Sequence, residues 1–88
     1  MTTKPPSSVS EHPGDSFEKI AYTSVSGIPT EEPNDRNRLG YHVWRWLTIK
    51  QGTLEGAIRE SGCRMKIARG EALEIISREL EKQGIKVR

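Results

Sequence analysis

All five prolines of this 88-residue chain lie within its first 35 residues, so long regular elements are expected only after that point. The same 35 residues hold ten Ser and Thr, eight apolar residues, and six acids against two bases, a net charge of −4. Residues 36–88 hold twelve bases against six acids, a net charge of +6, and the other 21 apolar residues. We therefore expect an acidic, flexible, disordered N-terminal arm over residues 1–35 and a basic helical domain over residues 36–88.

Two stretches of the arm have sequence features of their own. Residues 17–25, FEKIAYTSV, carry enough apolar side chains to dock a short strand or an irregular segment on the domain. The acidic stretch from Glu31 to Asp35 is interpreted either as a solubilising linker or as a segment that folds back over the basic domain and competes with DNA.

The first helix of the domain is predicted over residues 36–51. Apolar residues recur there at spacings of four and three, on one helical face: Leu39, Val43, Trp46 and Leu47. Asn34 or Asp35 is the expected N-cap, and Gly52 is the expected end of the helix. The alternative is a strand over residues 43–49, which is disfavoured because it would bury an arginine.

Two further helices are predicted downstream. The first spans residues 54–61, with Thr53 as N-cap and Gly62 at its end. The second is centred on the helically spaced apolar residues between 72 and 80, and Gly84 ends it. The preceding residues 63–70 fit either a helical extension or a strand. Residues 85–88, IKVR, are expected to form a short C-terminal strand.

The stretch Thr53–Val87 resembles the helix-turn-helix and winged-helix DNA-binding families. Ala57 and Ile58 stand where those families have small or apolar residues, Gly62 matches the glycine of the turn, and Cys63 matches the apolar residue after it. The resemblance implies a mainly α, three-helix domain in which the helix after the turn enters the major groove of DNA. The C-terminal strand would stand in place of a wing.

The densest basic cluster without an acid consists of Arg64, Lys66 and Arg69. We expect it to contact DNA phosphates, with an arginine reaching guanine edges. Further contacts are expected at the flanks of the cluster, from Lys50, Arg59, Lys86 and Arg88.

Trp44 and Trp46 flank an arginine in the first predicted helix. On a helix these two positions point about 200° apart, so one side chain is expected in the core and the other half-exposed. The exposed tryptophan is a candidate for a dimer or partner interface, with base stacking as a further alternative.

The remaining composition argues against several other classes. One cysteine and two distant histidines exclude a disulfide framework and predict no metal site, and phosphate-binding glycine motifs are absent. No apolar run is long enough for a membrane span. We therefore expect no cofactor, no enzymatic activity and a cytoplasmic location.

Two hypotheses of different class follow. The first is a small DNA-binding protein, a transcriptional regulator or accessory nucleoprotein factor, that binds double-stranded DNA as a homodimer. The alternative is a protein–protein adaptor or inhibitor that binds a larger protein through the aromatic helix over residues 36–51. RNA binding through an α/β fold is the third hypothesis.

Overall fold

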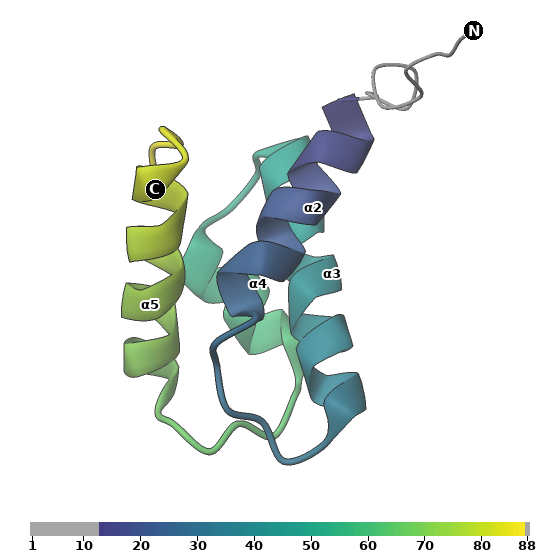
Figure 1. Ribbon diagram of the computed structural model, residues 1–88, viewed down its shortest axis with the longest axis vertical. Helices are drawn as coiled ribbons and strands as arrows, with labels where there is room; N and C mark the ends of the chain where they lie inside the picture. The colour runs from purple at the N-terminus through teal and green to yellow at the C-terminus, as the bar shows by residue number, and fades with distance from the viewer. Residues whose placement is uncertain (1–12, 88) are drawn as a thin grey trace, which may run out of the picture.

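The chain folds into packed α-helices. The computed structural model describes the backbone of residues 13–87 and the side chains of residues 17–87 (Figure 1). Four helices follow one another in this described part, namely α2 (Pro13–Val25), α3 (Pro33–Ile49), α4 (Leu54–Ser61) and α5 (Arg69–Lys82). α2 and α4 pack on α3, and α5 packs on α2 and α4. The prediction of a mainly α fold is confirmed.

Residues 17–25 are helical, and the expectation of a strand or loose arm there is wrong. They belong to α2, whose Ala21 and Val25 are fully buried, as is Ile28 just beyond its end. Ala21 and Val25 are four residues apart and therefore lie on one face of the helix, and Ile28 of the following loop continues the same buried side. The hydroxyl of Ser24 donates to the carbonyl of Ile20 at 2.8 Å, so even this buried polar side chain is satisfied within the helix. The folded part therefore begins well before residue 36.

The predicted boundary at residue 35 thus falls inside the fold. Residues 26–32 form the loop between α2 and α3, and α3 starts at Pro33. The predicted flexibility of the first twelve residues lies outside the described residues. The composition of residues 1–35 concealed this because their few apolar side chains are concentrated in one short amphipathic stretch after residue 17.

α3 confirms the predicted first helix and excludes the strand alternative, but its ends differ from the expected ones. Its N-cap is Glu32, followed by a proline at the first helical positions, where the missing N–H costs nothing. Its C-cap is Lys50, which takes the left-handed conformation with φ of 59° and donates its backbone N–H to the carbonyl of Trp46. The helix therefore starts three residues earlier than predicted and ends before Gly52.

α2 and α3 approach closely at Gly40. This glycine is buried, and a Cβ atom there would overlap Cδ1 and Cε1 of the Tyr22 ring and lie 3.2 Å from its Cγ. Next to this contact, the guanidinium of Arg36 donates to the backbone carbonyls of Val25 and Ser26 at the end of α2. Gly40 and Arg36 together fix the position of α2 on α3.

α4 matches its predicted bounds. The hydroxyl of Thr53 accepts a hydrogen bond from the backbone N–H of Gly56 at 3.0 Å, which satisfies one free donor of the first turn. Gly62 ends the helix with φ of 63°, a left-handed conformation that glycine adopts at little cost. The sequence signals at both ends were local, and both are confirmed.

Residues 63–70 form neither the predicted helical extension nor the predicted strand over most of their length, but an extended loop. Residues 62–68 run beside the α2–α3 loop, and one isolated antiparallel bridge joins Thr30 to Met65 (Figure 1). The backbone N–H of Glu31 donates to the carbonyl of Arg64 at 3.2 Å. These few pairings hold two loops together without forming a sheet.

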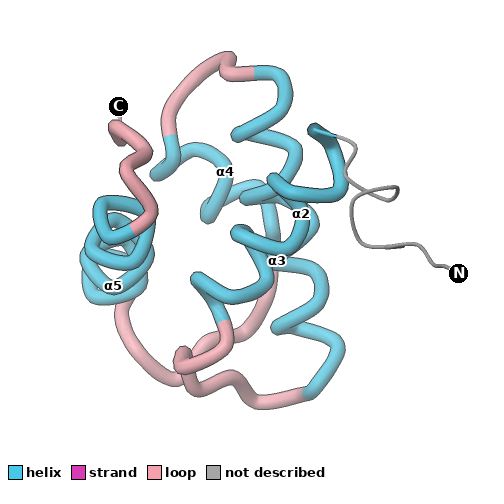
Figure 2. The backbone as a smooth tube through the Cα atoms, turned by 45° about the horizontal axis from the view of Figure 1, so that its top comes forward, coloured by secondary structure: helices cyan, strands magenta, loops and turns pink. Residues whose placement is uncertain are grey.

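α5 carries the predicted buried positions, with Ala72, Ile76 and Leu80 fully buried. The C-terminal strand is wrong, because residues 83–87 form a turn and an irregular tail, and no strand is found in residues 13–87 (Figure 2). The backbone N–H of Ile85 donates back to the carbonyl of Leu80 at 2.9 Å. The chain there closes on its own helix, and no neighbouring strand is present in the described part to pair with it.

Candidate nucleic-acid interface

One side of α3 is exposed along the whole helix. We call it the α3 outward face, and it consists of Asn34, Asn37, Arg38, Tyr41, Arg45 and Thr48. These residues recur at spacings of three and four, opposite the buried stripe that includes Leu39 and Val43. At 1.5 Å per residue the 17-residue helix is about 25 Å long. The face is therefore long enough to follow several nucleotides or a second helix.

The α3 outward face carries no carboxylate. The sequence has no acid from residue 36 to residue 54, and the one acid of α3, Asp35, is 1% exposed and points into the fold. The exposed positions of α5, in contrast, include Glu71, Glu74 and Glu81. Of these two helices, only α3 offers its exposed side to a polyanion without like-charge repulsion.

The two arginines of this face differ in their surroundings. Arg38 lies 3.4 Å from a carboxylate oxygen of Asp35, yet its side chain is 47% exposed. Arg45 is exposed and forms no ion pair with any residue from 17 to 87. It borders a hollow of about 300 Å³ between α3 and α4, which is also lined by His42 and Ile49 and by one acid of α4, Glu60. Arg45 is thus a cation available to a ligand.

Aromatic side chains adjoin the arginines. Tyr41 is 46% exposed, and its ring lies 5.4 Å from that of His42 and 5.7 Å from that of Trp44. Trp46 is only 6% exposed and its indole Nε1 has no hydrogen-bond partner in the described part, so it belongs to the core. One tryptophan in the core and one half-buried is what the spacing predicted. The partner-interface role stays a prediction for both tryptophans, and Trp44 offers more surface for it than Trp46, which only borders the hollow between α3 and α4.

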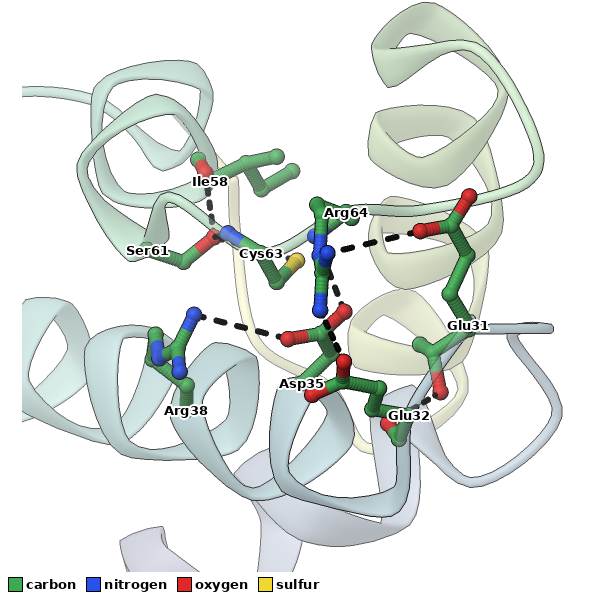
Figure 3. A network of polar contacts seen from close by, with 9 residues as sticks. Glu31, Glu32, Asp35, Arg38, Ile58, Ser61, Cys63 and Arg64 are labelled. Carbon is green, nitrogen blue, oxygen red and sulfur yellow. Dashed lines mark hydrogen bonds and ion pairs between the residues drawn. The ribbon is translucent and has the colours of Figure 1, made fainter.

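Arg64, the first member of the predicted basic cluster, is surrounded by acids (Figure 3). Its Nε lies 3.7 Å from a carboxylate oxygen of Glu31, and its Nη2 is paired with Glu32. Its backbone N–H donates to Asp35 Oδ2 at 2.9 Å. The hydrogen bond to Glu32 is the main reason that the pKa of Arg64 is raised above its ordinary value. The cluster is therefore partly neutralised by residues that are distant in sequence.

Lys66 and Arg69 are exposed and form no ion pair within the described part of the chain. Arg69 borders a hollow of about 50 Å³ beside α4, together with Arg59, whose guanidinium lies 3.8 Å from Glu55. Lys66, in the loop, and Arg69, at the start of α5, remain candidate phosphate contacts at the end of the molecule where Arg64 lies.

The other predicted contacts are dispersed. Lys50 caps the C-terminal end of α3, whereas Arg64 lies by its N-terminal end. Lys86 borders a hollow that also contains Glu74 and Glu81 of α5. Arg88 lies outside the described residues.

The structure therefore does not bring together on one surface the six predicted basic residues that it describes. It exposes Arg38 and Arg45 instead, which the sequence reasoning missed. The acid-free run after Asp35 was the signal that could have found them.

The described part of the chain shows neither a metal site nor a membrane-spanning helix. Residues 17–87 contain no group of three or more His, Cys, Asp or Glu side chains placed to hold a metal ion. Cys63 is 7% exposed and is contacted by the hydroxyl of Ser61 at 3.4 Å. None of the helices between residues 13 and 87 combines the length and apolar character that a membrane crossing needs.

No family model, no curated protein and no solved structure matches the chain.

Proposed function

We propose that this chain is a small, non-enzymatic DNA-binding protein that contacts duplex DNA through the α3 outward face. The observation that carries the proposal is the absence of any carboxylate on that face, together with the exposure of Arg38 and Arg45. Positive charge on a helix face without acids is the electrostatic footprint of phosphate binding, because each contact releases a condensed counterion from the DNA.

The shape and chemistry of the helix support the same proposal. An α-helix with its side chains is about 10–12 Å wide, and the major groove of DNA is about 12 Å wide. Arginine pairs with guanine edges or phosphates, and asparagine pairs with adenine edges, so Asn34, Asn37 and Arg38 supply the groups that base reading uses. A module of this size covers one half-site, so we expect a homodimer on a palindromic site.

Three observations favour α3 over the α4–α5 segment that resembles a helix-turn-helix. Seven residues, 62–68, separate α4 from α5, where the motif uses a turn of about three or four. The exposed side of α5 carries carboxylates. The guanidinium of Arg64 is already paired. Lys66 and Arg69 then act as phosphate contacts beside the main surface.

The test is fluorescence anisotropy of a labelled duplex of about 20 base pairs at about 50 and 200 mM salt. Arg45→Gln should weaken binding and reduce the magnitude of the salt slope by about 0.9 for each phosphate that Arg45 neutralises in the wild-type complex. Arg78→Gln is the matched control, because it removes the same charge from α5, where Arg78 is 64% exposed. Lys66→Gln/Arg69→Gln reports on the loop end of the molecule.

Absence of duplex binding at 50 mM salt would overturn the proposal. So would equal weakening by the Arg45 and Arg78 variants, since that pattern reports only the net charge of the protein.

A second candidate function is an adaptor or inhibitor that binds an acidic protein. Tyr41 and Ile49 are the two large apolar side chains described as exposed, at 46% and 45%, and both lie on α3. Exposed aromatic and arginine residues are typical of interface hot spots. This function predicts no duplex binding at low salt.

A further inference from the structure

The loop before α3 and the loop before α5 are held together by two different sets of contacts. The first set is made by the backbone and by one buried side chain, and it includes the Thr30–Met65 bridge and the bond from the Arg64 N–H to Asp35. The second set joins only exposed side chains, because Glu31 and Glu32 hold the guanidinium of Arg64. The first set fixes the loops, and the second fixes only the charged end of one side chain.

The second set contributes little to folding. The side chains of Glu31 and Glu32 are each 51% exposed and that of Arg64 is 62% exposed. Ion pairs that remain in water add little to stability, because solvent screens them and the side chains lose freedom. Their main consequence is electrostatic, since two carboxylates cancel the charge of the Arg64 guanidinium.

The paired guanidinium lies at the N-terminal end of the α3 outward face. Asp35 connects the two, since one of its oxygens accepts from the backbone of Arg64 and the other from Arg38 (Figure 3). A guanidinium presents the same fork of donors to a carboxylate and to a phosphate. A DNA strand on the α3 outward face would therefore meet Arg64 with its Nε and Nη2 already paired to carboxylates.

We propose that Glu31 and Glu32 act as an internal competitor, occupying at Arg64 the place that a DNA phosphate takes in the complex. This inference rests on the proposed DNA binding. Binding of DNA then requires the exchange of carboxylates for phosphate at Arg64, and the displaced carboxylates remain near the DNA backbone. The acidic loop lowers the affinity for DNA of any sequence without touching the bases.

The size of the effect follows from counterion release. In the wild-type chain, the counterion released when Arg64 takes up a phosphate is offset by the cations that the displaced carboxylates attract. A variant without those carboxylates should release about one more counterion in total, which steepens the salt slope by about 0.9. If the variant and the wild-type chain bind equally at 1 M salt, the variant should bind about 15-fold more tightly than the wild type at 50 mM and about 4-fold more tightly at 200 mM. The expected result is therefore an affinity increase that shrinks as salt is added.

The experiment compares the full chain with Glu31→Gln/Glu32→Gln on a duplex of about 20 base pairs. Glu74→Gln/Glu79→Gln is the matched control, because it removes two negative charges from α5, where both glutamates also lie in ion pairs. Both glutamates lie on α5, which packs on α2 and α4, so the control leaves the residues of the α3 outward face unchanged. A third variant repeats the loop substitutions in an Arg64→Ala background, where the increase should disappear.

The outcomes separate the two proposals. If the wild-type chain binds DNA through Arg45 but the loop variant binds no more tightly than the α5 control, the competitor is disproved and the DNA-binding function stands. If the increase persists without Arg64, the competitor is likewise disproved. If neither the wild-type chain nor the loop variant binds at 50 mM salt, both proposals fail. An increase specific to the loop variant and dependent on Arg64 supports the competitor.

Discussion

Substitution of Gly40 by alanine tests how α2 is attached to α3. Alanine is a better helix former than glycine by about 1 kcal/mol in a helix interior, so a free site would gain stability. Gly40 is not free, because its Cβ would overlap the ring of Tyr22. Forcing an extra carbon into a packed contact costs about 1–3 kcal/mol, and the ring atoms involved lie close to the backbone of α2. We therefore expect Gly40→Ala to destabilise the chain by up to about 2 kcal/mol.

Gly70 provides the matched control. It lies in the first turn of α5, and a Cβ there would meet nothing within 4 Å. Gly70→Ala should therefore stabilise the fold by up to about 1 kcal/mol. In a domain of this size each kcal/mol moves the Tm by about 4–8 °C, so the two alanine variants should be well separated in thermal unfolding followed by circular dichroism.

A second comparison tests whether the ring of Tyr22 causes the loss of stability in Gly40→Ala. In a Tyr22→Ala background the obstructing ring is gone, and Gly40→Ala should become stabilising, which the double-mutant cycle reports as a coupling between the two positions. The reasoning would be refuted if Gly40→Ala raised the Tm as much as Gly70→Ala, or if the effect of Gly40→Ala were the same with and without the tyrosine.

Two further predictions concern buried and titratable groups. Asp35→Ala removes the acceptor of the Arg64 N–H and should lower the free energy of unfolding, measured in urea, by about 1–3 kcal/mol. Asp35→Asn keeps an acceptor oxygen and should lower it by less. Equal losses in the two variants would contradict this role of Asp35. Burial, then Glu18 and Tyr41, raise the pKa of Tyr22 above its ordinary value of 10. The unfolded chain then ionises first, so the stability that Tyr22 contributes is complete below pH 10 and is lost as the pH rises through the higher folded pKa. Tyr22→Phe should show a shallower loss of stability as the pH rises above the ordinary tyrosine pKa of 10, and an unchanged pH profile would contradict the shift.

The helices that could be predicted were those with local signals. Thr53 and Gly62 defined α4 at both ends, because capping depends only on the neighbouring few residues. The apolar spacing of Ala72, Ile76 and Leu80 identified α5 in the same way. α2 was missed because its short apolar stripe, which ends in Ala21 and Val25, was averaged with a polar and proline-rich neighbourhood.

The candidate surface was only half predictable. The excess of positive charge after residue 35 is a property of composition, and it directed attention to a polyanion. Which of these cations are available to a ligand depends on the folded structure. Arg64 was selected because its cluster with Lys66 and Arg69 contains no acid. The folded loops nevertheless bring Glu31 and Glu32, more than thirty residues away, onto its guanidinium.

The sequence by itself determined that this chain forms amphipathic helices with defined caps and that its later part is basic, because periodicity, capping and charge depend on residues close together in the chain. The tertiary structure alone decided that α2 belongs to the core, that the loop over residues 62–68 is joined to the α2–α3 loop, and that two acids surround the guanidinium of Arg64. The physical reason is that burial and ion pairing depend on which distant segments meet, and those encounters are set by the packing of whole helices.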